Sequence, residues 1–141
     1  MARTLVLGYD DSPSAHAALE QTIARSKETG ASVVVVFGYY ITPWGGTGGG
    51  SIREAIEAVG TDAIRRAVVD LEAAGIETSS RLVEGKPADA LIEVAQEVGA
   101  EAIIVGTVGE NPITGALLGS VVLRLVQRSP IPVLVVPTVE G

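Results

Sequence analysis

The sequence predicts one α/β domain, residues 1–141, built on a five-stranded parallel sheet with helices on both faces. Three observations lead to this fold class. Hydrophobic residues make up 47% of the chain but aromatic residues only 4%, so the core has to be packed from aliphatic side chains. Short apolar runs, typical of strands buried on both faces, alternate with longer stretches of helical periodicity. Strict strand–helix alternation favours parallel strands joined by right-handed crossovers.

The first strand and the first helix are expected on either side of a short acidic turn. Residues 3–9 form an aliphatic run that stops at a pair of aspartates. Ser12 is then a typical helix N-cap and Pro13 a typical first helical residue. Apolar positions recur at helical spacing until Gly30, which is expected to end the helix.

The second strand, residues 31–38, precedes a glycine-rich stretch. Residues 43–51 are expected to form a flexible loop, because five of the six residues from 45 to 50 are glycine. A long helix follows and closes at Gly75. Its inward face is expected to consist of Ile52, Ala55, Ile56, Val59, Ala63, Ala67 and Leu71.

Three further strands and two further helices complete the alternation. Residues 76–85 are less apolar, which predicts an outer strand, and Pro87 and Gly99 mark the ends of the next helix. The remaining strands are expected at residues 101–106 and 131–137, and residues 120–128 lie within the last helix.

The connection between the fourth strand and the last helix contains more glycine than a turn needs. Its spacing is Gly106-x2-Gly109-x9-Gly119-Ser120. It is not a Walker phosphate loop, which requires a lysine, nor the first-strand glycine motif of dinucleotide-binding folds. Glycines let backbone N–H groups approach an anion, and Ser120 lies where a helix dipole favours negative charge. The segment therefore predicts a phosphate-binding loop.

Two segments follow strand ends that ligands often use. Asp10 and Asp11 follow the first strand, and the glycine segment follows the fourth. If these strands are neighbours, both segments face one crevice at the carboxyl ends of the strands, where ligands bind in open parallel sheets.

The glycine spacing resembles the nucleotide motif of the universal stress protein family, Gly-x2-Gly-x9-Gly followed by Ser or Thr. Three more stretches are similar to that family: YDDSPSAHAAL, EGKPADALIEVAQEVGAEAIIVGT and LLGSVVLRLVQRSPIPVLVVP. The four blocks occur in the family's order, and only residues 43–51 fall outside the resemblance.

The resemblance implies a Rossmann-like sheet of order 3-2-1-4-5. It also implies a stress-response protein that binds ATP or a related adenine nucleotide (AMP or ADP) as a regulatory or sensing module. Asp10 is then expected near the ribose, the phosphates or a bound Mg²⁺, and the main chain at Gly38 near the adenine. The phosphates would be carried by Gly106, Gly109, Gly119, Ser120 and Val121.

Two departures from the family pattern bear on this function. Thr107-Val108 stands between the first two glycines, where the family often has a basic or polar residue, and Asp11 stands where it often has glycine. A second carboxylate beside the phosphates would repel a triphosphate, so binding is expected to depend on Mg²⁺. The alternative is a homodimeric stress protein of the same fold that binds no nucleotide and acts through protein partners.

Composition disfavours several other functions. The chain has 17 acidic and 10 basic residues and a net charge of −7, which disfavours binding to nucleic acid or to an anionic membrane. It has no apolar run long enough to span a membrane, no recognisable signal peptide and no cysteine. A cytoplasmic protein is expected.

Catalysis is not expected either. A receiver domain also has acidic residues after its first strand, but here the third strand lacks a phosphoacceptor Asp and the fifth lacks a Lys. No general base accompanies the glycine segment, and His16, the only histidine, has no histidine or cysteine partner. The protein is therefore expected not to be an enzyme, or at most to be a very slow ATPase.

The last strand predicts a homodimer. Val133–Val136 is wholly apolar and would lie at an edge of a 3-2-1-4-5 sheet, where an exposed strand is a template for pairing. Antiparallel pairing with the same strand of a second copy, about a two-fold axis, would satisfy both edges. The resemblance implies the same contact.

Overall fold

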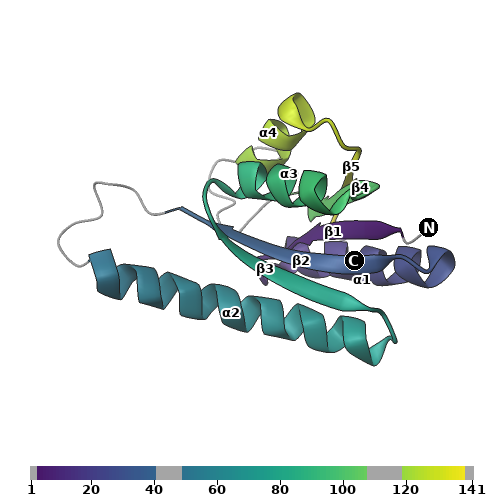
Figure 1. The fold of residues 1–141 in the computed structure, drawn as a ribbon, viewed down its shortest axis with the longest axis horizontal. Helices are drawn as coiled ribbons and strands as arrows, with labels where there is room; N and C mark the ends of the chain where they lie inside the picture. The colour runs from purple at the N-terminus through teal and green to yellow at the C-terminus, as the bar shows by residue number, and fades with distance from the viewer. Residues whose placement is uncertain (1–2, 41–48, 108–118, 139–141) are drawn as a thin grey trace.

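The chain folds into a five-stranded parallel sheet with helices on both faces, as the computed structural model in Figure 1 shows. The structure describes residues 3–40, 49–107 and 119–138. Its strands are β1 (Thr4–Gly8), β2 (Ser32–Tyr39), β3 (Thr78–Glu84), β4 (Ala102–Gly106) and β5 (Val133–Val136). Its helices are α1 (Pro13–Thr29), α2 (Gly49–Ala73), α3 (Pro87–Val98) and α4 (Ser120–Arg128). The order β3-β2-β1-β4-β5 confirms the predicted fold class and strand order.

β1 lies at the centre of the sheet, between strands that continue the chain in opposite directions. Gly8 of β1 is in register with Val36 of β2, and Leu7 with Ile104 of β4. The chain runs outward from β1 through β2 to β3, and then returns across the sheet to β4 and β5. The strand order therefore reverses between β1 and β4, and a reversal of this kind opens a crevice beyond the carboxyl ends of the strands.

Two aliphatic layers form the core, one under the helices on each face of the sheet. Leu7 and Val35 pack with Leu71 of α2, whereas Val6 and Ile103 pack on the face covered by α3 and α4. All five side chains are fully buried. Because neighbours along a strand point to opposite faces, each central strand has to be apolar throughout. No helix in the described part of the chain is long and apolar enough to cross a bilayer.

The helix ends follow the signals in the sequence. Ser12 caps α1 by accepting a hydrogen bond from the backbone N–H of Ala15 at 3.1 Å, and Pro13 begins the helix. Gly30 and Gly99 end α1 and α3 with φ angles of 77° and 63°. These left-handed angles are the ones that glycine adopts without steric cost.

Helix α2 starts earlier than predicted and is tied to the sheet near its start. It begins at Gly49, so the last residues of the predicted loop 43–51 are helical, and residues 41–48 lie outside the described residues. The Tyr39 hydroxyl of β2 donates a hydrogen bond to Glu57 at 2.6 Å. Arg53 forms an ion pair with Glu84 of β3.

Only the second half of α2 has the buried face that the apolar spacing predicts. Ala67 and Leu71 are fully buried, but Ile52 and Val59 are exposed. The first half of α2 extends past the end of the sheet, as Figure 1 shows. Helical periodicity identifies an apolar stripe but cannot tell where the sheet beneath it ends.

The carboxyl end of β4 packs directly against the first turn of α1. A Cβ atom on Gly106 would collide with the side chain and the carbonyl group of Ser14. Gly8, at the end of β1, is less constrained, because a Cβ atom there would meet side-chain atoms of Leu91 and Val105 at 3.0 Å. The absence of a side chain at Gly106 therefore sets how closely α1 approaches the sheet.

We expect Gly106→Ala to lower the free energy of unfolding by about 1–3 kcal/mol, the usual cost of overpacking, because the new methyl group has to displace the backbone of α1. Gly8→Ala is the comparison and should cost less, since the Leu91 and Val105 side chains can move. Urea denaturation followed by circular dichroism measures both. A Gly106→Ala variant as stable as the wild type would contradict this packing.

Candidate functional site

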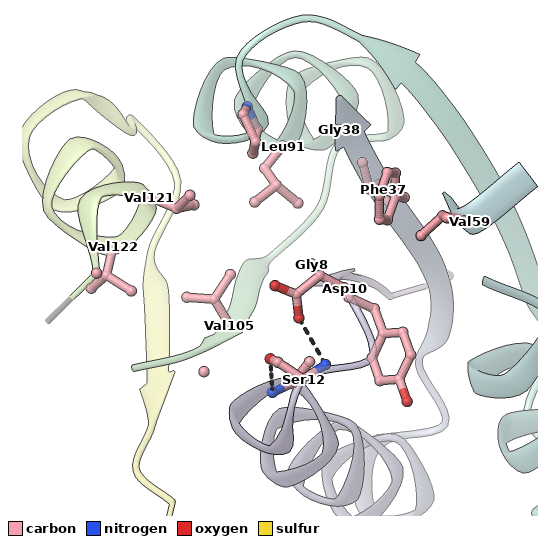
Figure 2. Close-up of a pocket in the computed structure, with 16 residues that line it drawn as sticks. Gly8, Asp10, Ser12, Phe37, Gly38, Val59, Leu91, Val105, Val121 and Val122 are labelled. Atoms are coloured by element: carbon pink, nitrogen blue, oxygen red, sulfur yellow. Dashed lines mark hydrogen bonds between the residues drawn. The ribbon is translucent and has the colours of Figure 1, made fainter. Parts of the chain in front are cut away.

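A pocket opens where the strand order reverses, beyond the carboxyl ends of β1, β2 and β4 (Figure 2). Residues from the starts of α1, α3 and α4 and one residue of α2 complete its walls. Most of its lining is aliphatic or glycine, and Asp10 is the one charged side chain among the described residues that line it.

The structure brings most of the predicted site residues together. Those that line the pocket are Asp10, Gly38, Gly106, Gly119 and Val121. Ser120 is not among the lining residues, and its side chain is exposed. Gly109 lies outside the described residues.

The turn after β1 directs Asp10 into the pocket. The backbone N–H of Ser12 donates a hydrogen bond to Oδ1 of Asp10 at 3.1 Å, and Figure 2 shows this bond beside the helix cap. In a turn of this kind the aspartate side chain accepts a hydrogen bond from the backbone two residues later, which fixes the orientation of the carboxylate. Among the described residues, no Lys, Arg or His forms an ion pair with Asp10.

Asp11 corrects one expectation, because its carboxylate is not a second charge in the pocket. It does not line the pocket and is paired with Arg66 of α2. The Tyr9 hydroxyl donates a hydrogen bond to it at 3.0 Å, and Nε2 of His16 lies 3.0 Å away. Asp11 has a φ of 65°, in the left-handed region that favours glycine and that Asp tolerates better than most residues.

The same contacts keep Asp11 charged and Tyr9 neutral. Burial alone would raise the pKa of the Asp11 carboxyl, but hydrogen bonds from Tyr9 and Arg66 outweigh it and hold that pKa below its ordinary value. Burial, and then the hydrogen bond to Asp11, raise the pKa of the Tyr9 phenol. The Asp11 charge is therefore balanced within the turn.

The amino end of α4 presents backbone amides beside the pocket. Gly119 is the N-cap residue, and its own N–H donates to the carbonyl oxygen of Thr107 at 2.7 Å. The N–H groups of Ser120, Val121 and Val122 have no acceptor within the helix, because a first helical turn has none. Val121 and Val122 line the pocket. Amides without an acceptor inside the helix, together with the helix dipole, favour an anion at this position.

β2 continues past the end of β1, so main-chain groups near its end face the pocket and not a neighbouring strand. The carbonyl oxygen of Val36 accepts from Tyr9 on the β1 side at 3.1 Å, and that of Tyr39 accepts from Gly85 on the β3 side at 2.6 Å. Because the two sides alternate along a strand, the N–H and C=O groups of Gly38 face the β1 side, beyond the last residue of β1. They offer one donor and one acceptor to the pocket.

Sequence reasoning missed the apolar walls. Phe37 and Val59 lie on one side of the pocket and Leu91 on the other (Figure 2). A Cβ atom on Gly38 would lie 2.8 Å from Cα of Pro87, so the start of α3 closes the pocket against β2. Spacing placed Val59 in the core and treated Phe37 as an ordinary strand residue. The one available signal was the position of Phe37 near the carboxyl end of a predicted strand, and Val59 had no such signal.

A bidentate ion pair holds α4 against α3 beside the pocket. Nε and Nη2 of Arg124 donate to the two carboxylate oxygens of Asp89 at 3.0 and 3.1 Å. The hydrogen bonding from Arg124 lowers the pKa of Asp89. Two parallel bonds of this kind fix orientation as well as distance, so they help to keep the α4 amides in place.

The described residues contain no group of three or more His, Asp or Glu side chains that could hold a metal ion. Asp10 alone could contribute a carboxylate within the pocket. A Mg²⁺ ion often uses one or two protein carboxylates together with ligand phosphates, so this donor set fits a metal that arrives with a nucleotide.

Comparison with known proteins settles the family. The model of the Universal stress protein family matches residues 1–137. The chain belongs to the universal stress protein family. The universal stress protein MJ0531 of Methanocaldococcus jannaschii is 30% identical over 138 residues, which cover 95% of this chain and 81% of the relative.

Solved structures of the family share the fold. A universal stress protein in complex with cAMP is 31% identical and has a TM-score of 0.74, with 97% of this chain and 98% of that chain covered. The universal stress protein from Archaeoglobus fulgidus in complex with dAMP is 24% identical, with a TM-score of 0.68 and coverage of 96% and 98%.

Replacing Asp11 separates its charge from its backbone conformation. Asp11→Asn removes the charge but still tolerates a positive φ, whereas Asp11→Ala adds left-handed strain of about 1–2 kcal/mol. We expect the alanine variant to be the less stable of the two in urea denaturation at pH 7. Equal stability of the two variants would mean that the turn relaxes without Asp11.

The stability difference between the wild type and Asp11→Asn should depend on pH. Because the folded-state pKa of Asp11 is lowered from 3.8, its stabilisation is fully present above that value and is lost as the pH falls through the lowered folded-state pKa. Urea denaturation from neutral to acid pH should therefore show a constant difference that shrinks only below about pH 4. If the stability difference already shrinks near neutral pH, a group other than the Asp11 carboxyl causes the pH dependence.

Proposed function

We propose that this chain binds an adenine nucleotide and acts as a regulatory or sensing module through that binding. The pocket carries the proposal. It combines apolar walls beside the main chain of Gly38 with the amides at the start of α4. Asp10 lies between these two regions, because it follows β1, and β1 lies between β2, which carries Gly38, and β4, which leads to α4.

The β2 side of the pocket suits the base. Phe37, Val59 and Leu91 provide apolar surface for a planar ring. The N–H and C=O groups of Gly38 complement the acceptor nitrogen and amino donor that adenine presents side by side. A main-chain donor and acceptor of this kind recognise adenine without any polar side chain.

The α4 side suits the phosphate. Val121 and Val122 line it, and the amides of the first turn point to where an anion is stabilised. We propose that Gly106, Gly119 and Val121 adjoin the phosphate, that Gly109 and Ser120 also belong to the phosphate loop, and that Asp10 adjoins the ribose. With ATP or ADP bound, Asp10 would hold Mg²⁺ together with phosphate oxygens.

Two relatives of known structure support this ligand class. Their complexes contain cAMP and dAMP, and each of these ligands joins adenine to a single phosphate group. The pocket of this chain has one region for each part of such a ligand. An apolar region with an exposed main-chain edge suits adenine, and the amino end of α4 suits the phosphate.

The proposed role is binding without rapid turnover. Among the described lining residues, Asp10 is the one charged side chain, and the raised pKa of Tyr9 keeps its phenol protonated. A fast phosphoryl transfer needs a positioned base and cationic groups around the phosphates, which these residues do not provide. The proposal keeps the cytoplasmic location expected from the cysteine-free sequence.

Calorimetry with AMP, and with ATP plus Mg²⁺, tests nucleotide binding. We expect saturable binding that weakens by roughly tenfold or more, about 1.4 kcal/mol, in Gly119→Val, because a side chain would enter the amino end of α4. Leu123→Val is the matched control, since Leu123 is exposed on the same helix and outside the pocket. No heat and no thermal shift at millimolar nucleotide would refute the proposal.

We also propose a homodimer through β5. Among the described strands, β5 pairs only with β4, and the side chains of Val133 and Val135 are partly exposed. The opposite edge, β3, carries Arg81 and Glu84, charges that discourage pairing. An uncharged edge is left for a second copy of the chain. The same contact supports the alternative function, a homodimer that binds no nucleotide and acts through protein partners.

Sedimentation velocity at tens of micromolar tests this contact. The wild type should run as a dimer, and Val135→Lys as a monomer, because a lysine side chain would be crowded against the second copy. Leu82→Lys is the matched control on the opposite edge strand and should remain dimeric. A monomeric wild type, or a dimeric Val135→Lys variant, would rule out this interface.

A further inference from the structure

Three arginines near the pocket are already paired with carboxylates outside it. They lie on the surrounding helices, and the ion pairs are Arg53 with Glu84, Arg66 with Asp11 and Arg124 with Asp89. No Lys, Arg or His occurs among the described residues that line the pocket. The sequences of residues 41–48 and 108–118, which continue from β2 and from the end of β4, contain none either.

A fixed negative charge remains inside the pocket. The Asp10 carboxylate is held by the N–H of Ser12 and, among the described residues, has no ion-pair partner. The groups that oppose it are the α4 amides, whose helix dipole is equivalent to about half an elementary charge. The pocket's own charges are therefore net negative, so they do not fully balance even a singly charged ligand, and each further negative charge on the ligand adds repulsion.

We propose that the pocket selects nucleotides by charge, with Asp10 as the specificity-determining residue. Without a divalent cation it takes a singly charged cyclic phosphodiester of adenosine in preference to ATP. This inference rests on the proposed nucleotide binding. A cyclic phosphodiester has a single ionised oxygen, whereas a phosphomonoester carries about −1.5 to −2 at pH 7 and a triphosphate still more. Each further charge is repelled by Asp10 and meets no cationic side chain.

A divalent cation should remove this preference. Mg²⁺ between Asp10 and the phosphate oxygens would convert the repulsive carboxylate into a metal ligand. The gain is largest for the triphosphate, which has the most charge to neutralise and the most oxygens to offer. In EDTA the protein should therefore bind cAMP most tightly, AMP less tightly and ATP most weakly. Mg²⁺ should reduce the differences between these three affinities.

Calorimetry on the full chain with cAMP, AMP and ATP, in EDTA and in Mg²⁺, tests the inference. In EDTA the dissociation constant for ATP should exceed that for cAMP by about tenfold or more, and Mg²⁺ should reduce this ratio. Asp10→Asn should lower the ratio in EDTA at least severalfold. Glu28→Gln removes one negative charge from the exposed far end of α1, outside the pocket, and should keep the wild-type ratio. Circular dichroism confirms that both variants are folded.

The outcomes separate this inference from the proposed function. ATP binding in EDTA as tight as that of cAMP overturns charge selection but leaves nucleotide binding intact. A ratio that Asp10→Asn does not change overturns the role of Asp10. Failure of all three nucleotides to bind the wild type overturns the proposed function and this inference together.

Discussion

The left-handed turn at Asp11 is the constraint on which the pocket depends. β1 is the central strand, so the chain has to leave the sheet within a few residues and start α1 beside β4. A φ of 65° at Asp11 makes that turn, and the contacts with Arg66 and Tyr9 hold it. The residues on either side then take fixed positions, with Asp10 directed into the pocket and Ser12 at the helix cap.

The same turn joins the site to the packing of the fold. Once α1 begins at this point, its first turn lies against the end of β4, where Gly106 leaves no room for a side chain. A shift of the turn would move α1 off Gly106 and take the Asp10 carboxylate out of the crevice. Arg66 comes from the second half of α2, which packs on the same face of the sheet as α1, so a helix distant in the sequence helps to hold the turn.

The glycine spacing that resembles a nucleotide motif has several physical origins. Gly106 is required by the close approach of Ser14. Gly119 gives its N–H to Thr107, so the amides left for a ligand belong to the residues that follow it. A motif of this kind therefore reports how strands and helices meet as well as what they bind.

Local signals made most of the fold predictable, whereas the site depended on tertiary contacts. Aliphatic runs, the Ser12 cap and the glycines after α1 and α3 each act within a few residues, so the sequence identifies them directly. The pairing of Asp11 with Arg66 joins positions 55 residues apart, and no local pattern reveals it. Val59 shows the same limit, because its helical spacing matches the core while the end of the sheet places it at the pocket.

The hydrogen bond between Gly119 and Thr107 has a consequence for how this domain can diverge. It joins the end of β4 directly to the start of α4 at 2.7 Å, so the two ends of this connection are held side by side. The entropy of closing a loop rises slowly with its length, by about 0.6 kcal/mol for each doubling. A peptide inserted between the two residues would therefore leave the sheet and α4 where they are. The connection between β4 and α4 is therefore a place where the domain can gain a new surface beside its pocket at a small cost in stability.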